Sequence, residues 1–377
     1  MRIVDVQARH VSAPMTSSKP VTLAMGRVRK KDAVIVRVDS DSGLVGYGEA
    51  HHGLAPTAVA DLVNTSLREL VVGRDAMATE DVWSAVHRYR RSHSLGTAVD
   101  LAYSGVDTAL WDLKAKALGV GLSTLLGGTP KTFPAYMGGL TLGLETPAGE
   151  LVDEVRAYVT EHGYTAVKIR VGRGPDEDAA RLRLLRESLP EDLTLLVDAN
   201  TSYDVADCVR LLPALGALGI GWFEEPLSPH LVDELARLRA TSPVPLATGE
   251  NYHSRTDFHR LAELRAVDVF QADVSKVGGV TELRKVGDIA SAYGLRFAPH
   301  TSQTALNYAA TLHVMAAADA SYLYEGTHLD NPFDVLFEGA PRVVDGYARP
   351  PEGTGIGVTV DDSLFTRFPS VPGPAYL

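Results

Sequence analysis

The sequence predicts an α/β protein in which eight parallel strands alternate with helices to form a (β/α)₈ barrel, preceded by a smaller α+β domain. From Phe133 onward, short β-branched runs alternate with stretches of helical periodicity, which is typical of repeated βα units. Eight such strands within about 200 residues agree with the number of strands and the chain length of a closed (β/α)₈ barrel. The predicted strands are 135–140, 166–171, 193–197, 221–224, 245–249, 268–272, 295–299 and 322–325.

The first 125 residues have a different pattern of hydrophobic periodicity. Strand-like alternation at 2–11 and 32–38 is followed by an Asp41-Ser42-Gly43 turn, which predicts a β-hairpin with residues 45–49. Helical patterns follow at 58–70, 78–91 and 97–117. We therefore expect an α+β domain over 1–125, a barrel over 126–330, and a segment rich in Pro and Gly over 331–377 that wraps back onto the first domain.

Composition narrows the class of protein. The 377 residues include 36 Lys and Arg against 47 Asp and Glu, a net charge of −11, which predicts no general attraction for nucleic acid or anionic lipid. The single cysteine, Cys208, cannot form an intrachain disulfide. The N-terminus lacks the apolar run of a signal peptide, and no stretch is apolar enough to cross a bilayer. A cytoplasmic protein without membrane partners is expected.

Three acidic residues follow three consecutive predicted strands. Asp198, Glu224 and Glu250 are each separated by 26 residues, so they would meet at the C-terminal face of the barrel, where such barrels place their active sites. Converging carboxylates repel one another unless a cation neutralises them, and oxygen ligands favour Mg²⁺. The spacing predicts one Mg²⁺ per subunit. The alternative is that each acid merely caps the following helix.

The second predicted strand carries two cations. Side chains alternate along a strand, so Lys168 and Arg170 share one face, here the barrel interior. An unpaired ammonium in the interior costs free energy, so a buried Lys168 is expected to have a partner or a function. The pair would bind a substrate carboxylate or transfer its α-proton, or would form a salt bridge to a neighbouring strand.

The last three strands end in titratable residues. Asp273 follows strand six and His300 ends strand seven, so the two are expected to be neighbours. An Asp bonded to a His fixes the imidazole tautomer and raises its basicity, which suits a general base or acid. Glu325 on strand eight would donate a hydrogen bond to a substrate oxygen if protonated.

Taken together, these motifs resemble the enolase superfamily, and within it the mandelate racemase subgroup. Muconate-lactonising relatives place a catalytic lysine where this chain has Asp273, and Lys276 is interpreted as supporting. The resemblance covers nearly the whole chain and implies a modified barrel under an N-terminal capping domain completed by the C-terminal segment. It also implies Mg²⁺ and enediolate chemistry, with assembly as dimers or octamers. The motifs are 168–170, 198–200, 222–226, 248–251 and 273–281, with His300 and Glu325.

The activity predicted from this resemblance is that of an acid-sugar dehydratase, a carbon–oxygen lyase acting on a small α-hydroxy carboxylate. His300 would remove the α-proton and then protonate the departing β-hydroxyl, giving a 2-keto-3-deoxy acid. The alternative is an isomerase, a racemase or epimerase of an α-hydroxy or cyclic amino acid, with Lys168 as the second base. Many such enzymes carry Lys where this chain has Arg170, and guanidinium is a poor proton acceptor. A carboxylate-binding protein without turnover is a third possibility.

Residues of the capping domain are expected to choose the substrate, because capping loops close over a barrel mouth and exclude water. The two candidate segments are 16–29, with Lys19, Arg27 and Arg29, and 49–53, with His51 and His52. Asn200 and Tyr136 are expected to contribute from the barrel. Lys30 and Lys31 are expected to be solvated, as charged loop residues usually are.

Overall fold

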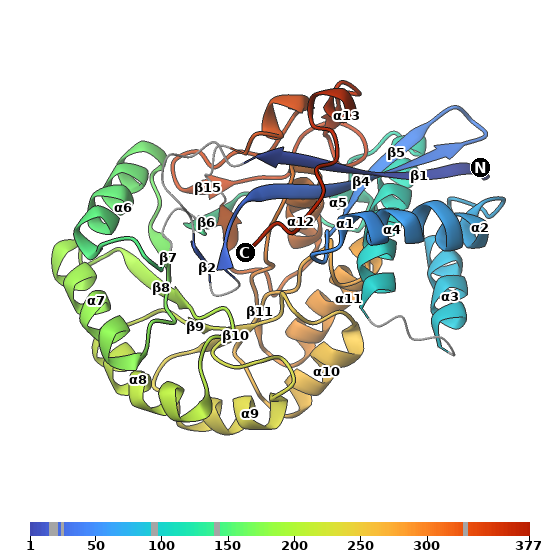
Figure 1. The fold of residues 1–377 in the computed structure, drawn as a ribbon. Coiled ribbons are helices and arrows are strands. Elements are labelled where there is room, and N and C mark those ends of the chain that lie inside the picture. Colours follow the sequence, from blue (N-terminus) through green and yellow to red (C-terminus); the bar gives the residue numbers. More distant parts are fainter. Residues whose placement is uncertain (15–21, 24–25, 92–96, 139–143, 327–330) are drawn as a thin grey trace.

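The computed structural model describes residues 1–14, 22–23, 26–91, 97–138, 144–326 and 331–377. Two bodies pack together in Figure 1: a small antiparallel sheet with its helices, and a ring of helices surrounding short strands. The fold class predicted from the sequence is confirmed. Among the described residues, no helix is both long and apolar enough to cross a membrane.

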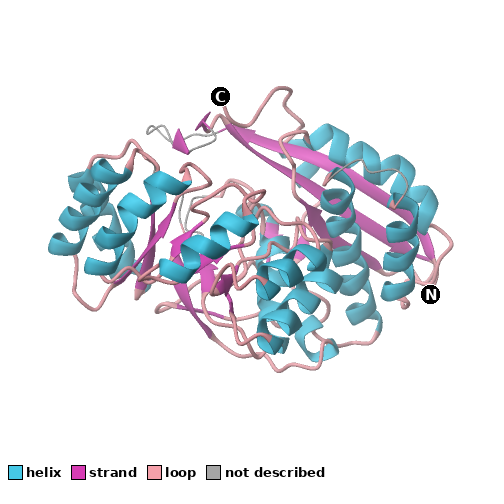
Figure 2. Ribbon diagram, turned by 90° about the horizontal axis from the view of Figure 1, so that it is seen from below, coloured by secondary structure: helices cyan, strands magenta, loops and turns pink. Residues whose placement is uncertain are grey.

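The N-terminal domain is built on a three-stranded antiparallel sheet, in the order β1 (Ile3–Pro14), β4 (Lys30–Ser40) and β5 (Val45–Ala50). The predicted hairpin joins β4 and β5. Helix α4 (Ala98–Ala117) packs closely on β5, and a Cβ at Gly48 would lie 2.2 Å from the carbonyl oxygen of Gly105. Glycine at this position therefore allows the helix to approach the strand. Figure 2 shows the long strands of this sheet beside their helices.

The other elements of this domain are short. The predicted helix over 58–70 is three consecutive pieces, because a π-helical turn interrupts it. The remaining elements are β2 (Thr22–Leu23), β3 (Gly26–Arg27), α1 (Pro56–Leu62), the π-helical turn η1 (Val63–Leu67), α2 (Arg68–Val71), α3 (Thr79–Arg90) and α5 (Leu122–Leu125).

Eight parallel strands form the barrel, and seven helices connect them within the described residues. In sheet order the strands are β12 (Arg296–Phe297), β11 (Val269–Phe270), β10 (Leu246–Thr248), β9 (Phe223–Glu224), β8 (Thr194–Asp198), β7 (Ala166–Arg170), β6 (Phe133–Met137) and β13 (Tyr324–Gly326). The helices are α6 (Ala148–His162), α7 (Pro175–Ser188), α8 (Val205–Ala217), α9 (Val232–Thr241), α10 (Arg255–Glu263), α11 (Gly279–Ala292) and α12 (Ala305–Ala317).

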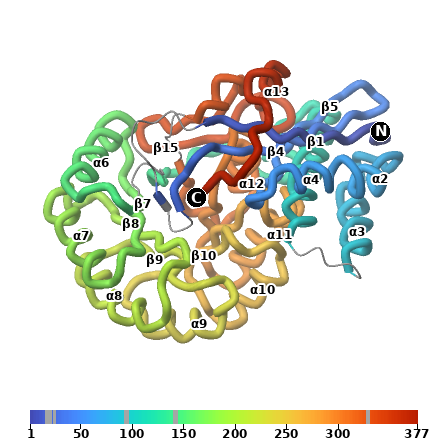
Figure 3. The backbone as a smooth tube through the Cα atoms, in the orientation of Figure 1, coloured from blue at the N-terminus to red at the C-terminus, as the bar shows by residue number. Residues whose placement is uncertain are grey.

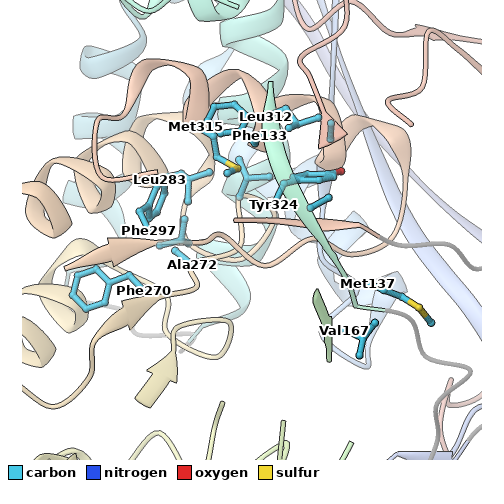
Figure 4. Packing of buried hydrophobic residues seen from close by; sticks show 14 of the residues in the cluster. Phe133, Met137, Val167, Phe270, Ala272, Leu283, Phe297, Leu312, Met315 and Tyr324 are labelled. Atoms are coloured by element: carbon cyan, nitrogen blue, oxygen red, sulfur yellow. The ribbon is translucent and has the colours of Figure 1, made fainter. Parts of the chain in front are cut away.

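The barrel closes between β12 and the chain that leads into β13. The Phe297 amide donates to the carbonyl of Ala320 at 2.9 Å, and the Tyr322 amide donates to the carbonyl of Phe297 at 2.8 Å. Apolar side chains fill the space between the strands and the outer helices, including Phe270, Phe297, Leu283 and Met315 in Figure 4. This packing fixes the strand ends on which the site is built.

The C-terminal segment returns to the N-terminal domain, as expected. Ser12 on β1 donates its amide to the carbonyl of Phe368, and Arg27 on β3 exchanges two backbone hydrogen bonds with Leu377. The C-terminal end consequently lies over the ring of barrel elements in Figure 3. The elements of this segment are η2 (Asp334–Leu336), β14 (Phe337–Glu338), β15 (Tyr347–Ala348), β16 (Thr359–Val360) and α13 (Leu364–Arg367).

Candidate active site

Strand alternation builds the site in two layers inside the barrel. The lower layer is an apolar cluster of inward-facing residues that includes Ala166, Leu196 and Trp222. Two residues further along the same strands, side chains again point inward, and here they are polar or charged. The pairs are Ala166 with Lys168, Leu196 with Asp198, Trp222 with Glu224, Ala298 with His300, and Leu323 with Glu325.

Lys168 lies at the centre of the upper layer, with 1% of its side chain exposed. Its Nζ is 2.8 Å from Glu224 Oε1, 2.8 Å from Glu325 Oε1 and 3.4 Å from Asp198 Oδ2. Burial alone would lower the pKa of Lys168, but the charges of Glu224 and Glu325 raise it well above its usual value. Lys168 is therefore held as a cation among three carboxylates.

Arg170, two residues after Lys168 on β7, belongs to the same network. Its guanidinium forms an ion pair with Asp198 and donates to Asn200 Oδ1 at 2.8 Å. The backbone amide of Asn200 in turn donates to Asp198 Oδ1 at 2.8 Å. Lys168 and Arg170 share the interior face, as their spacing predicted, and the salt bridges to neighbouring strands are also present.

His300 and Asp273 form the expected pair. The Nδ1 of His300 lies 2.7 Å from Asp273 Oδ2, and its Nε2 lies 2.6 Å from Glu250 Oε2. Burial opposes protonation of His300, but the charges of Glu250 and Glu325 and the hydrogen bond to Asp273 raise its pKa to about 10. Hydrogen bonds from Ser275, Ser302 and Asn307 also reach Asp273.

Burial raises the pKa of Asp273, but these donors and the His300 charge outweigh it, so the pKa of Asp273 is lowered. Asp273 is therefore ionised and can orient the imidazole.

A cavity of about 130 Å³ opens above this layer, between the barrel and the N-terminal domain. It brings together residues from both bodies and from the C-terminal segment. Its walls include Lys30, Lys31, Asp32, His51, His52, Arg170, Asn200, Glu250, Lys276, His300, Gln303, Tyr308, Glu325 and Tyr376. Most of the predicted site residues are thus gathered around one space.

Two predicted substrate-binding residues are not part of the cavity wall. Tyr136 is fully buried in the lower layer, where its ring lies 5.5 Å below Lys168 Nζ. The residue at the level of the site is instead Gly138, directly after β6, whose missing Cβ leaves room for Glu325. Arg27 is exposed, whereas the next residue, Val28, is buried and lines the cavity, so the Arg27 side chain points away from it. Lys19 and most of the segment 16–29 lie outside the described residues.

Lys30 corrects a further expectation. It is buried and not solvated, and its Nζ lies 3.1 Å from Asp32 Oδ2. The spacing of two residues on β4 puts both side chains on one face, which is a signal that the sequence contained. Lys276, interpreted as supporting, lines the cavity with its Nζ 3.7 Å from Glu250 Oε2. Tyr376, the penultimate residue of the sequence, was not predicted from any local pattern.

The donor set fits a divalent cation. Among the described residues, no three His, Cys, Asp or Glu side chains already converge at metal-binding distance, because the carboxylates are turned toward cationic side chains. Six carboxyl groups nevertheless share this region with four cationic groups, so ionisation of all six would leave two negative charges in excess, and burial raises the pKa values of Glu224 and Glu225 against that ionisation. The acids are Asp198, Glu224, Glu225, Glu250, Asp273 and Glu325, and the cations are Lys168, Arg170, Lys276 and protonated His300.

The pKa of Glu224 reflects this excess. Burial and the charge of Asp198 raise it to about 8 despite the contact with Lys168. A divalent ion held by Asp198, Glu224 and Glu250 would remove the excess charge, and oxygen donors suit Mg²⁺.

Comparison with known proteins places the chain in a family. Residues 5–127 match the N-terminal domain of the mandelate racemase / muconate lactonizing enzyme family, and residues 150–364 match the enolase C-terminal domain-like family. The chain therefore belongs to the enolase superfamily, in its mandelate racemase-like branch.

Individual relatives agree with this assignment. The chain is 32% identical to a D-galactarolactone cycloisomerase of Agrobacterium fabrum, covering 94% of this chain and 96% of the relative. It is 31% identical to an arabinonate dehydratase of Saccharolobus solfataricus, covering 89% and 90%. A crystal structure of a racemase from Streptomyces coelicolor with bound magnesium shares 30% identity over 97% of this chain and 99% of that one, with a TM-score of 0.88. These comparisons support an enzyme of this superfamily without selecting between a lyase and an isomerase.

Proposed function

We propose that this protein is a Mg²⁺-dependent dehydratase of a small sugar acid, which removes the α-proton and eliminates the β-hydroxyl to give a 2-keto-3-deoxy acid. The observation that carries the proposal is the His300–Asp273 pair, whose imidazole lines the same cavity as Arg170, Asn200 and Glu325. A base and acid in one side chain, set opposite carboxylate-binding groups, suits an elimination on one face of the substrate.

In the proposed reaction, Arg170 and Asn200 orient the substrate carboxylate beside Lys168. His300 Nε2 takes the α-proton, and the C–H electron pair becomes the enediolate, whose developing negative charge Lys168 stabilises at a fixed position. The C–O bond to the β-hydroxyl then breaks, His300 returns its proton to that oxygen, and water leaves. The enol that remains tautomerises to the 2-keto acid.

The metal supplies Lewis-acid neutralisation of the substrate carboxylate when bound. The ligands would be Asp198, Glu224 and Glu250, and the charge of Glu250 is the largest of those that raise the pKa of His300. Offsetting that charge would return His300 toward a pKa at which it accepts a proton near neutral pH.

An isomerase is the second candidate, and the similarity to a cycloisomerase favours it. Two observations weigh against a two-base racemase. Arg170 stands where a second lysine base would be needed, and a guanidinium stays protonated. Lys168 is fixed as a cation by Glu224 and Glu325, which makes it a poor proton acceptor. A cycloisomerase that uses only His300 is compatible with both.

Incubation with Mg²⁺ and a panel of sugar acids and their lactones tests the proposal. A dehydratase gives 2-keto products, detected with semicarbazide, and loses activity on dialysis against a chelator until Mg²⁺ is restored. Exchange of the α-proton in D₂O, or ring opening of lactones, without any 2-keto acid would reject elimination in favour of an isomerase. Full turnover in chelator would reject the metal site. Assembly as a homo-oligomer stays a prediction, checked by gel filtration with light scattering.

A further inference from the structure

We propose that the part of the cavity wall formed by the N-terminal domain and the C-terminal tail is a subsite that recognises the hydroxyl groups of the substrate, so that the enzyme selects aldonates over aldarates. This distal wall consists of Lys30, Asp32, His51, His52 and Tyr376. The inference rests on the proposed function, since it specifies which sugar acids the same site accepts. Three features of the wall carry it.

The first feature is the fixed tautomer of two histidines. The backbone amide of Gly53 donates to Nδ1 of His51 at 3.1 Å, and that of Leu54 donates to Nδ1 of His52 at 3.1 Å. A nitrogen that accepts a hydrogen bond carries no proton, so each ring is neutral and keeps Nε2–H as its donor. The rings stack at 4.3 Å, an arrangement that disfavours charge on both. The pair therefore presents neutral N–H donors, which suit hydroxyl oxygens.

The second feature is a tyrosine fixed by the C-terminal tail. Tyr376 forms an antiparallel bridge with Val28, flanked by hydrogen bonds from the Arg29 amide to Ala375 and from the Leu377 amide to Arg27. Further back, the Val371 amide donates to Ser12 Oγ at 3.0 Å. The ring of Tyr376 lies 6.3 Å from that of His52. These bonds fix a phenol beside the imidazoles, and its hydroxyl both donates and accepts.

The third feature is the charge balance of the wall. Lys30 is paired with Asp32 at 3.1 Å and also donates to the carbonyl of Val371. Lys31 also lines the cavity, and its charge acts on Asp334, whose pKa burial raises to about 6. Each lysine at this end thus has an acidic neighbour. Among the described residues, a second carboxylate would meet Asp32 and lysines that already have acidic partners, so its desolvation would be poorly compensated.

Binding measurements on the metal-loaded protein test the charge class. Aldonates and aldarates of the same configuration, galactonate with galactarate and gluconate with glucarate, are titrated into the His300→Asn variant in Mg²⁺, so that no turnover interferes. The structure predicts that the best aldonate binds at least about tenfold more tightly than its aldarate. Equal or tighter binding of the aldarate would overturn the subsite and leave the proposed function standing. If no sugar acid of either kind binds, the proposed function fails, and the subsite fails with it.

A second variant tests the tyrosine. Tyr376→Phe removes one hydroxyl, and the loss of one hydrogen bond predicts a rise in KM for the aldonate of about 2- to 12-fold with kcat within about twofold. Tyr347→Phe is the matched control, because Tyr347 is exposed on the C-terminal segment away from the cavity, and it should leave KM unchanged. An unchanged KM in Tyr376→Phe would remove Tyr376 from the subsite.

The histidine tautomers can be read without activity. Long-range nitrogen–proton NMR spectra of the metal-loaded protein near neutral pH should show His51 and His52 protonated at Nε2 alone. A proton at Nδ1 of either ring would contradict the role of these two imidazoles as neutral N–H donors, whatever the substrate proves to be.

Discussion

The pKa values of two histidines that line the same cavity are shifted in opposite directions. The pKa of His300 is raised to about 10, because Glu250, Glu325 and Asp273 overcome the effect of burial, whereas burial lowers the pKa of His52 to about 4. Both side chains are nearly enclosed by protein, so burial alone does not distinguish them. The difference lies in the partner of each ring: carboxylates for His300 and a backbone amide for His52.

The comparison separates two tasks within one space. In the proposed reaction, the barrel supplies charges where a substrate proton and its electron pair move, and electrostatic stabilisation there is worth most when the groups are fixed and dry. In the proposed subsite, the N-terminal domain and C-terminal tail supply neutral imidazole and phenol donors, which would bind hydroxyl groups without altering the pKa of the base. Changing either side should affect one task much more than the other.

The largest effect is expected at the charged end. His300→Asn removes the proposed proton acceptor while an amide N–H can still reach Asp273, so kcat should fall by about 10²- to 10⁴-fold. Mg²⁺ binding, measured by calorimetry, should be retained. His259→Asn, on an exposed histidine that pairs with Glu263, is the control and should be without effect. Unchanged turnover in His300→Asn would assign the base to Lys168.

Lys168→Met should strongly destabilise the barrel. The substitution leaves Glu224 and Glu325 buried without their common cation, and breaking a buried ion pair from one side costs about 3–5 kcal/mol. Urea unfolding in the presence of a chelator measures this loss in the free energy of unfolding. Arg237→Met, which removes an exposed partner of Glu234, should cost at most about 1 kcal/mol. A similar small cost in both variants would show that the charged layer is not held by Lys168.

The distal wall should make the protein sensitive to acid. The pKa of His52 is lowered in the folded state, so between pH 6.5 and about 4 the unfolded chain binds more protons and stability falls as pH falls. Asp32 attracts a proton to this ring, whereas Lys276, His10 and Lys30 repel it. The contribution of His52 between pH 7 and 5 is about 2 kcal/mol.

Urea unfolding of the protein and of His52→Gln at both pH values measures that contribution. The variant should lose less stability on acidification than the parent. An equal loss in both would place the acid sensitivity elsewhere, for example at His87, whose pKa is also lowered to about 4.

The same comparison explains what the sequence could predict. Barrel residues follow strand alternation, so Lys168, Asp198 and Glu224 could be placed on one rim from period and spacing alone. The wall residues come from segments far apart in the chain. Tyr376 reaches the cavity through backbone pairing with Val28, which no local pattern encodes. Arg27 was misplaced for the same reason, since its role in that pairing is carried by its backbone.

Tyr136 shows the limit of alternation itself. Tyr136 was expected to contribute to the site from the barrel, and it does lie inside the barrel, but its level along the axis depends on how neighbouring strands are staggered, which only the register shows. Tyr136 is paired with Glu325 in the sheet, yet its side chain belongs to the apolar layer, with Trp222 at 5.1 Å between ring centroids. Lys30 was expected to be solvated because its partner Asp32, only two residues away, was not considered.

The smallest effect is expected for Ser302→Ala, which perturbs the orientation of His300 without removing it. Ser302 Oγ donates to Asp273 Oδ2 at 3.0 Å, and Asp273 keeps its bonds from Ser275, Asn307 and His300. Losing one net hydrogen bond costs about 0.5–1.5 kcal/mol, which corresponds to a fall in kcat of about 2- to 12-fold. KM should stay constant, because Ser302 acts through Asp273 and not through the distal wall. A rise in KM with unchanged kcat would instead make Ser302, which lines the cavity, a substrate contact.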